Sequence, residues 1–295
     1  MRQLLLMACL ALAGPVHAQV ESGTDELLAS DRPEAWAMHY VGAATLMTAF
    51  GESPSLAPGQ WGAALDLGHI PRLNAQQQRV GLRGFKQEDL NKSPVFGRAR
   101  LSLGLPGAWV AELGWTPPVE INGLRTRNLL ALAFGRRLLV GDAFTLSARV
   151  FGQHGSAEGD ITCPAAGSGV VDPQANPVGC IAASDDRIAL RHYGADVTAA
   201  WASTPWHWYA SLGIARMEPE AHVDAQLGSY RDRSRLVARG NQPFVALGIG
   251  RDLDARWRLS LEALHVPLPV RRDPDATQQN DPLTSLRIQL RYQAR

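Results

Sequence analysis

Strict alternation of apolar and polar side chains is the feature that most restricts the folds open to this chain. In residues 206–215, WHWYASLGIA, every second side chain is apolar, beginning with Trp206 and Trp208, and the positions between them are small or polar. A period of two indicates a β-strand whose two faces meet different surroundings. The pattern recurs along most of the chain, and a short turn in residues 21–29 is the only helical signal. The sequence therefore predicts an all-β fold.

The alternating segments have the length of membrane-spanning strands, for which roughly ten residues suffice. One face of each segment is apolar and carries the tryptophans, whereas the other carries arginines and carboxylates at mid-strand. A bilayer outside and a wet interior explain this contrast better than a soluble sandwich does. We predict a transmembrane antiparallel up-and-down β-barrel. The predicted strands are residues 36–50, 60–70, 77–85, 96–103, 109–115, 127–136, 144–151, 192–201, 206–215, 242–250, 256–263 and 286–292.

The number of strands depends on residues 77–85, which alternate only loosely. Eleven other segments alternate, and bacterial single-chain barrels have even numbers of strands. We therefore predict about twelve strands and keep ten as the alternative.

The first residues have the form of a secretory signal. An arginine precedes an apolar run from Leu4 to Ala13, and Val16-His17-Ala18 resembles a cleavage site, which predicts a signal peptide over residues 1–18. Residues 19–35 are then predicted to be a periplasmic or plug segment, and residues 36–295 the barrel. Without Arg2, 28 Lys and Arg balance 28 Asp and Glu, so net charge gives no argument for nucleic acid binding.

Loop lengths orient the predicted barrel. If the last strand ends at the periplasm, the short connections at residues 105–106, 138–142, 203–205 and 251–254 are periplasmic, and the long ones at 155–186, 218–235 and 267–281 are external. This asymmetry is typical of outer-membrane barrels. The same count places the N-terminus and residues 70–76, IPRLNAQ, at the periplasm. Cys163 and Cys180 lie in the longest external loop and are predicted to form a disulfide, because exported proteins meet oxidising conditions.

Aromatic residues support this orientation, since their amphipathic rings prefer membrane–water interfaces. The predicted interface aromatics are Tyr40, Trp61, Trp109, Trp115, Phe134, Phe144, Trp201, Trp206, Trp257 and Tyr292. In this arrangement Trp61 and Trp115 lie near the external ends of their strands, and the others lie near the periplasmic ends.

The combination of signal peptide, alternating strands, long external loops and the terminal stretch LRIQLRYQAR resembles a Gram-negative outer-membrane β-barrel protein. The resemblance covers nearly all of the mature chain. It implies a class that includes porins, hydrophobic-solute channels, a phospholipase and enzymes that modify lipid A. The segments WTPPVEINGL and NKSPVFGRARLSLGLPG faintly resemble fatty-acid transporting barrels of an uncharacterised family. Many such barrels end on an aromatic residue, whereas here Gln293, Ala294 and Arg295 follow Tyr292.

The polar faces of the strands predict a charged interior. The residues predicted to face the lumen are Asp66, Arg98, Arg100, Glu112, Arg149, His192, Asp196, Arg256, Arg258, Glu262, Arg287 and Arg291. Their arginine excess favours anionic or polar solutes. The alternative is a plugged interior in which the charges pair across strands. No metal- or cofactor-binding motif is present in the sequence.

We predict that the protein is not an enzyme but a passive channel or binding protein for a small hydrophobic or anionic solute. It is expected to be a monomer whose partners are outer-membrane lipid and the barrel assembly machinery. One alternative is a lipid hydrolase, because His154 and Ser156 stand two residues apart and would share a strand face, as a base and a nucleophile require. The other is a structural or surface-interaction barrel that binds through the disulfide loop.

Overall fold

Ten antiparallel strands close into a barrel in the computed structural model, which describes residues 20–273, 275 and 277–294. Each strand pairs with its neighbours along the barrel, and the last strand pairs with the first to complete the ring. The barrel strands are β3 (Trp61–His69), β6 (Val95–Leu105), β7 (Trp109–Thr116), β9 (Leu124–Val140), β10 (Phe144–Gly159), β12 (His192–Ser203), β13 (Trp206–Met217), β18 (Gly240–Asp252), β19 (Trp257–Val266) and β22 (Leu283–Gln293).

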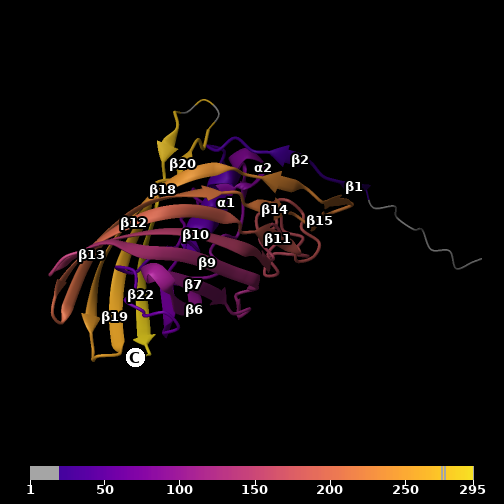
Figure 1. The fold of residues 1–295 in the computed structure, drawn as a ribbon. Coiled ribbons are helices and arrows are strands. Elements are labelled where there is room, and N and C mark those ends of the chain that lie inside the picture. The colour runs from indigo at the N-terminus through magenta and orange to yellow at the C-terminus, as the bar shows by residue number, and fades with distance from the viewer. Residues whose placement is uncertain (1–19, 274, 276, 295) are drawn as a thin grey trace, which may run out of the picture.

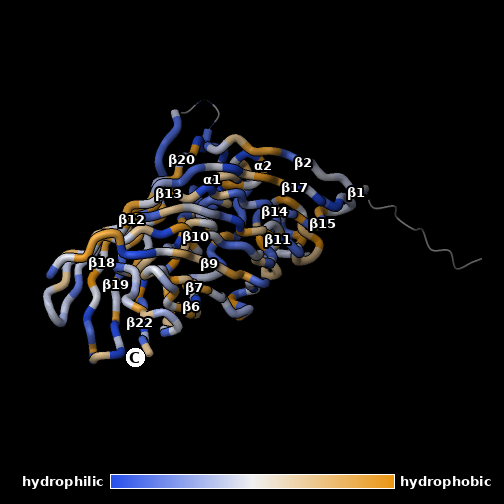
Figure 2. The backbone as a smooth tube through the Cα atoms, in the orientation of Figure 1, coloured by the Kyte–Doolittle hydropathy of each residue, from blue (hydrophilic) through white to orange (hydrophobic). Residues whose placement is uncertain are grey.

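Hydrophobic and hydrophilic residues alternate along the barrel strands (Figure 2). This alternation separates the inside of the barrel from the outside. On β13, Leu212 and Ile214 face outward and are 65% and 51% exposed, whereas Ser211 and Ala215 face inward and are buried. Closure gives each wall strand a neighbour on both sides, as a spanning sheet in lipid requires, although residues 95–98 of β6 have no partner toward β7 within the described chain. The fold is therefore the all-β up-and-down barrel that the sequence predicts.

The two ends of the barrel differ (Figure 1). Short connections join β6 to β7 through the 3₁₀ turn η1 (Pro106–Ala108), β9 to β10, β12 to β13, and β18 to β19, and the C-terminal strand ends on this side. Long connections occupy the opposite end. By the usual asymmetry of these barrels, the short-connection end is periplasmic and the other is external.

Short strands extend the wall at the external end. In order from β10, they are β11 (Asp186–Ala189), β14 (Glu220–His222), β17 (Arg235–Val237) and β2 (Asp25–Leu27), while β8 (Glu120–Ile121) pairs with β9. Smaller ladders join β1 (Val20–Ser22), β16 (Tyr230–Asp232) and β15 (Ala225–Leu227), β20 (Pro269–Val270) with β21 (Gln279–Asn280), and β4 (Arg79–Val80) with β5 (Lys86–Gln87). Through β1 and β2, the first described residues lie at the external end, in contrast to the predicted periplasmic N-terminus.

A helix occupies the interior where the sequence predicts the first strand, so the strand prediction for residues 36–50 is wrong. α1 (Pro33–Ala44) begins with a proline, which suits the first helical turn, and nearly all of its side chains are buried. A helix that is apolar all round is a buried helix, and this one has the barrel wall on every side. Residues 45–60 continue without a strand toward the periplasmic end, where Trp61 begins β3. Among the described residues, neither helix is long and apolar enough to span a membrane.

Residues 77–85 also form no barrel strand. They contain β4 and the single turn α2 (Gly81–Gly84), within the long external connection between β3 and β6. Leu82 and Arg83 have positive φ angles of 50° and 62°, which a spanning strand does not accommodate. Losing these two strands corrects the count from twelve to ten. The loss of the first strand also reverses the direction of β3, so Trp61 lies at the periplasmic end and residues 70–76 lie at the external end.

Candidate solute-binding site

The polar side chains of the barrel interior come from the inward faces of the wall strands. The structure places the following predicted lumen residues inside the barrel, buried or nearly so: Asp66, Arg98, Arg100, Glu112, Arg149, His192, Asp196, Arg258, Glu262, Arg287 and Arg291. Arg256 is the exception. It is exposed in the turn of residues 253–256, where its backbone N–H donates to Asp254, so its assignment to the lumen is corrected.

Arginines clamp the chain that leaves α1. Arg98 donates to the carbonyl oxygen of Thr45 at 2.7 Å, and Arg287 to that of Leu46 at 2.6 Å. Arg149 and Arg100 reach the carbonyl oxygens of Met47 and Thr48, at 2.6 Å and 2.8 Å. Arg287 also donates to the carbonyl oxygens of Ala43 and Ala44, at 3.1 Å and 3.2 Å. These last carbonyls of α1 have no partner within the helix, and positive charge is favourable there. The clamp therefore fixes the segment across the middle of the barrel.

Carboxylates neutralise two of these arginines, Arg100 and Arg149. Asp66 accepts a hydrogen bond from Arg100, and Asp196 accepts one from Arg149 at 2.7 Å. Nearer the periplasm, Glu52 of the interior segment lies 2.7 Å from Arg258. Buried charges are tolerated when they are paired and hydrogen-bonded in this way. Around these residues the barrel interior is filled by polar side chains. This arrangement corresponds to the plugged alternative and not to an open anion-selective lumen.

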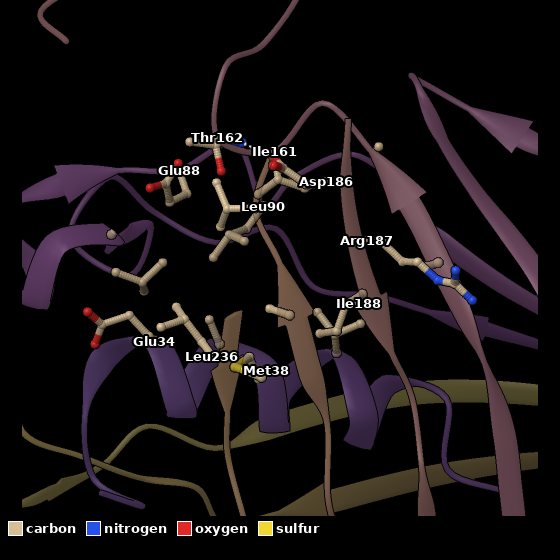
Figure 3. A pocket seen from close by; sticks show the side chains of 18 of the residues that line it. Glu34, Met38, Glu88, Leu90, Ile161, Thr162, Asp186, Arg187, Ile188 and Leu236 are labelled. Atoms are coloured by element: carbon tan, nitrogen blue, oxygen red, sulfur yellow. Dashed lines mark hydrogen bonds between the residues drawn. The ribbon is translucent and has the colours of Figure 1, made fainter. Parts of the chain in front are cut away.

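An apolar cavity lies above this core, between α1 and the external extension of the wall (Figure 3). Its volume is about 170 Å³. Met38 of α1, Leu236 of β17 and Ile188 of β11 line one side, and Leu90 and Ile161 lie toward the external edge. A small concave site with apolar walls is the usual form of a small-molecule site.

Charged groups at the edge of this cavity are already bound within the protein. Glu34 accepts hydrogen bonds from Arg32 at 2.7 Å and from the Arg83 N–H at 2.6 Å. Asp186 accepts from the Thr162 N–H at 2.6 Å and from the Ser184 hydroxyl at 2.8 Å. With these groups satisfied, the cavity offers its apolar walls to a ligand and no free charge.

Lys86 and Glu88 close the external edge. The Lys86 ammonium donates to Glu88 and to the carbonyl oxygen of Thr162, the latter at 2.7 Å. Burial raises the pKa of Glu88 to about 7, although Lys86 opposes the shift. Glu88 and Thr162 also line a larger external hollow of about 680 Å³, bordered by the disulfide loop. This contact therefore separates the apolar cavity from the external medium.

A second apolar cavity, of about 350 Å³, continues the first toward the membrane. The two share five lining residues, Ala37, Val41, Leu90, Leu124 and Ala157. The second cavity is lined by Tyr40 and Ala44 of α1 and also by Leu65, Leu67 and Val95, whose side chains face the lipid. It therefore has walls on both the inner and the outer side of the barrel.

A gap in strand pairing explains this position. β6 pairs with β7 from Leu105 up to Ala99, opposite Trp115, but residues 95–98 pair only with β3. β7 ends at Thr116, and the chain leaves the wall through Pro117 and β8 before it returns as β9. The wall has a seam at this place, and the second cavity lies in it.

His154 and Ser156 stay on one face of β10 but do not form an exposed pair. Gly155, with φ of 149°, lies at a register shift between them in the pairing of β10 with β9. The extra residue at this shift is on β9, which advances from Leu130 to Arg127 while β10 advances from His154 to Ser156, so the alternation of β10 is kept. His154 is exposed on the outer surface, whereas Ser156 is only 2% exposed.

The predicted interface aromatics other than Tyr40 lie on the wall. Three of them, Trp257, Tyr292 and Trp61, lie on adjacent strands near the periplasmic end. The centroid of the Tyr292 ring is 5.0 Å from that of Trp257 and 5.8 Å from that of Trp61. Trp109, Phe134, Phe144, Trp201 and Trp206 lie on the periplasmic halves of their strands, and Trp115 lies at the external end of β7. Tyr40 is corrected, because it belongs to α1 and donates internally to Pro71 at 2.9 Å.

The disulfide predicted between Cys163 and Cys180 is present. It closes the longest external loop. Cys163, Cys180 and Ala225 of β15 form a small buried cluster, so the loop is tied to the neighbouring external ladder.

A closed barrel with a lipid-facing apolar belt, a periplasmic ring of aromatic side chains, short turns at one end and long loops at the other defines a Gram-negative outer-membrane β-barrel. No protein-family model matches the chain, and a search of curated proteins finds no match.

Solved structures similar to this chain are barrels of the same class. The outer membrane protease OmpT from Escherichia coli shares 11% identity over 82% of this chain and 99% of its own, with a TM-score of 0.38. The toluene transporter TbuX of Ralstonia pickettii shares 10% identity over 81% and 90%, with a TM-score of 0.33. Neisserial surface protein A shares 10% over 79% and 97%, with a TM-score of 0.33.

Proposed function

We propose that this protein passively binds a small, uncharged, hydrophobic solute at its external end and passes it sideways through the seam into the outer membrane. The observation that carries the proposal is the pair of apolar cavities that share Ala157 and Val41 and reach from α1 to lipid-facing Leu65 and Leu67. No covalent chemistry is invoked, and a single chain supplies both cavities.

The polar core argues for the sideways route. A solute that continued along the barrel axis would have to displace the segment held by Arg98, Arg149 and Arg287. Each of those contacts is a buried, charge-assisted hydrogen bond, which is costly to break without replacement. The seam between β6 and β7 requires no such step, because residues 95–98 have no partner on that side.

The apolar lining argues for an uncharged solute. Burying an unpaired ion against Met38, Ile188 and Leu236 would cost several kcal/mol, roughly the desolvation penalty of an ion. An apolar molecule instead gains ~25 cal/mol for each Å² that it removes from water. Of the two solute classes that the sequence suggests, the geometry therefore supports the hydrophobic one.

The test is transfer of the neutral fluorophore N-phenylnaphthylamine into proteoliposomes. Its fluorescence rises when it enters lipid, so a stopped-flow trace gives the rate. Gly97→Phe should fill the seam, and space exists for the change because a Cβ at Gly97 meets Leu67 at an ordinary 3.4 Å. Ala111→Phe, on the lipid face of β7 below the seam, is the matched control.

The wild type should accelerate entry over protein-free liposomes, Gly97→Phe should lower that gain roughly tenfold, and Ala111→Phe should preserve it. Equal rates for wild-type, Gly97→Phe and protein-free vesicles would refute the proposal. If Gly97→Phe and Ala111→Phe lowered the transfer rate equally, the seam would be refuted as the route. Heat-modifiable mobility on gels confirms that each variant is folded.

A further inference from the structure

The outward face of the external wall carries an ordered row of charges that no part of the solute pathway uses. Strand pairing aligns one residue from each of six strands, β9, β10, β11, β14, β17 and β2. In that order the row reads Arg125, Glu158, Arg187, His222, Arg235 and Asp25. Adjacent strands lie ~4.8 Å apart, so the row is roughly 24 Å wide.

The row lies on the side of the wall opposite to the solute cavity, although Arg187 and His222 also border that cavity. The strand neighbours of the row, Ala157, Ile188 and Leu236, line the cavity, so alternation directs the charged residues to the other side of the sheet. Figure 3 shows the Arg187 guanidinium extending away from the cavity. The row therefore belongs to the outer surface of the wall.

Cations outnumber the carboxylates that serve them. Glu158 lies 2.6 Å from Arg127 and 3.9 Å from Arg187, and these arginine side chains are 52% and 58% exposed. Glu220 lies 3.3 Å from Arg191 and 2.8 Å from Arg235, which are 48% and 40% exposed. Glu158 and Glu220 thus each serve two guanidinium groups, and Asp25 adds a further contact to Arg235 at 2.9 Å. Arg127, Arg187 and Arg191 keep N–H donors free for an external anion.

The position of this surface suggests what the anion is. Leu130 of β9 and Tyr193 of β12 are exposed on the lipid-facing wall. Arg127 lies three residues from Leu130, and Arg191 two residues from Tyr193, in both cases toward the external end. At ~3.4 Å per residue, Arg127 lies roughly 10 Å and Arg191 roughly 7 Å along the chain beyond the end of the apolar belt. That is the level of the lipid headgroups of the outer leaflet.

A hollow of about 510 Å³ gives this surface its shape. Arg127 and Arg187 lie on its membrane side with Glu158, while Asp185, Asp224 and Arg233 line the rest, together with His222. Arginine forks match phosphate geometry. Carboxylates repel phosphate but accept hydrogen bonds from sugar hydroxyls. The mixed lining therefore fits a headgroup that has both.

We propose that this outward face, centred on Arg127, Arg187 and Arg191, binds the phosphorylated sugar headgroup of the glycolipid that forms the outer leaflet. The acyl chains of that lipid lie against Leu130 and Tyr193, and its phosphates contact the arginines. This binding site is separate from the solute cavities and does not depend on their function.

The experiment measures lipid binding to the purified, folded barrel in detergent by native mass spectrometry. The probes are bisphosphorylated lipid A, its dephosphorylated form, phosphatidylglycerol and inorganic phosphate. The test variant combines Arg127→Gln and Arg187→Gln. The control combines Arg251→Gln and Arg256→Gln, two exposed arginines at the periplasmic end.

The wild type should retain bisphosphorylated lipid A, and the test variant should bind it roughly tenfold more weakly, while the control pair leaves binding unchanged. The dephosphorylated lipid should bind wild type and test variant alike. Unchanged binding to the test variant would overturn the proposal. So would equal retention of phosphatidylglycerol or of inorganic phosphate alone, because either would show that the sugar headgroup is not recognised.

Discussion

Arg149 on β10 and Asp196 on β12 lie side by side inside the barrel, with 2.7 Å between Nη2 and Oδ2, and the same guanidinium holds the carbonyl oxygen of Met47. This pair links the wall to the interior segment. Asp196→Ala would leave the buried Arg149 with only the more distant carboxylate of Glu112, at 3.6 Å, so we expect it to lower the free energy of unfolding by ~3 kcal/mol. Urea unfolding in micelles, followed by tryptophan fluorescence, measures the change. Asp142→Ala, in the exposed turn before β10, should have little effect, and an equal effect of the two would count against the clamp.

Ala157 tests the connection between the two apolar cavities. Its small side chain lines both, and it is 3% exposed. Ala157→Phe should occupy the shared space and reduce N-phenylnaphthylamine transfer roughly tenfold, with little loss of stability, because the ring enters existing volume. Rate and urea midpoint are measured on the same preparation. A variant that transfers at the wild-type rate would show that the cavities do not act in series.

Alternation in the sequence was sufficient to predict the barrel because a strand in a two-sided environment records that environment in every second residue. Arg149, Asp196 and Glu262 are inside for this reason. The same reasoning failed for residues 36–50. Their alternation is a by-product of a segment that is apolar nearly throughout, and proline at position 33 together with alanine-rich composition favours helix.

The solute cavities could not be predicted, because they depend on distant contacts. Met38, Leu90, Ile188 and Leu236 are ordinary apolar residues in four separate segments, and only the fold brings them together. The burial of Ser156 could not be predicted for the same reason, because it depends on the strands paired with β10, which are β9 and β11 at this position.

Glu88 should make the external segment sensitive to pH. Burial raises its pKa from 4.5 to about 7 in the folded protein, Lys86 opposes the shift, and Asp186 and Asp232 add to it. Below pH 4.5 both folded and unfolded states hold the proton. As the pH rises toward 7, the unfolded state releases it first, so stability falls by about 3 kcal/mol and then levels off.

Glu88→Gln removes this titration and keeps the shape of the side chain. The stability of the variant relative to wild type should therefore increase by about 3 kcal/mol between pH 4 and pH 8. Urea midpoints at the two pH values measure it. Glu120→Gln, in the external hairpin strand β8, is the control. A difference between variant and wild type that does not change with pH would contradict the assignment.

The disulfide should stabilise the external loop without supporting the barrel. Cys163 and Cys180 are 17 residues apart, and closing a loop of that size restricts its open states by ~3 kcal/mol. In Cys163→Ala/Cys180→Ala, proteinase K should cleave residues 160–186 roughly a hundredfold faster, because cleavage follows the population of the open loop. Mass spectrometry locates the cuts, and heat-modifiable mobility should stay unchanged. Reductant should reproduce the effect in wild type and add nothing in the variant. Equal cleavage rates would show that β15 and its neighbours hold the loop by themselves.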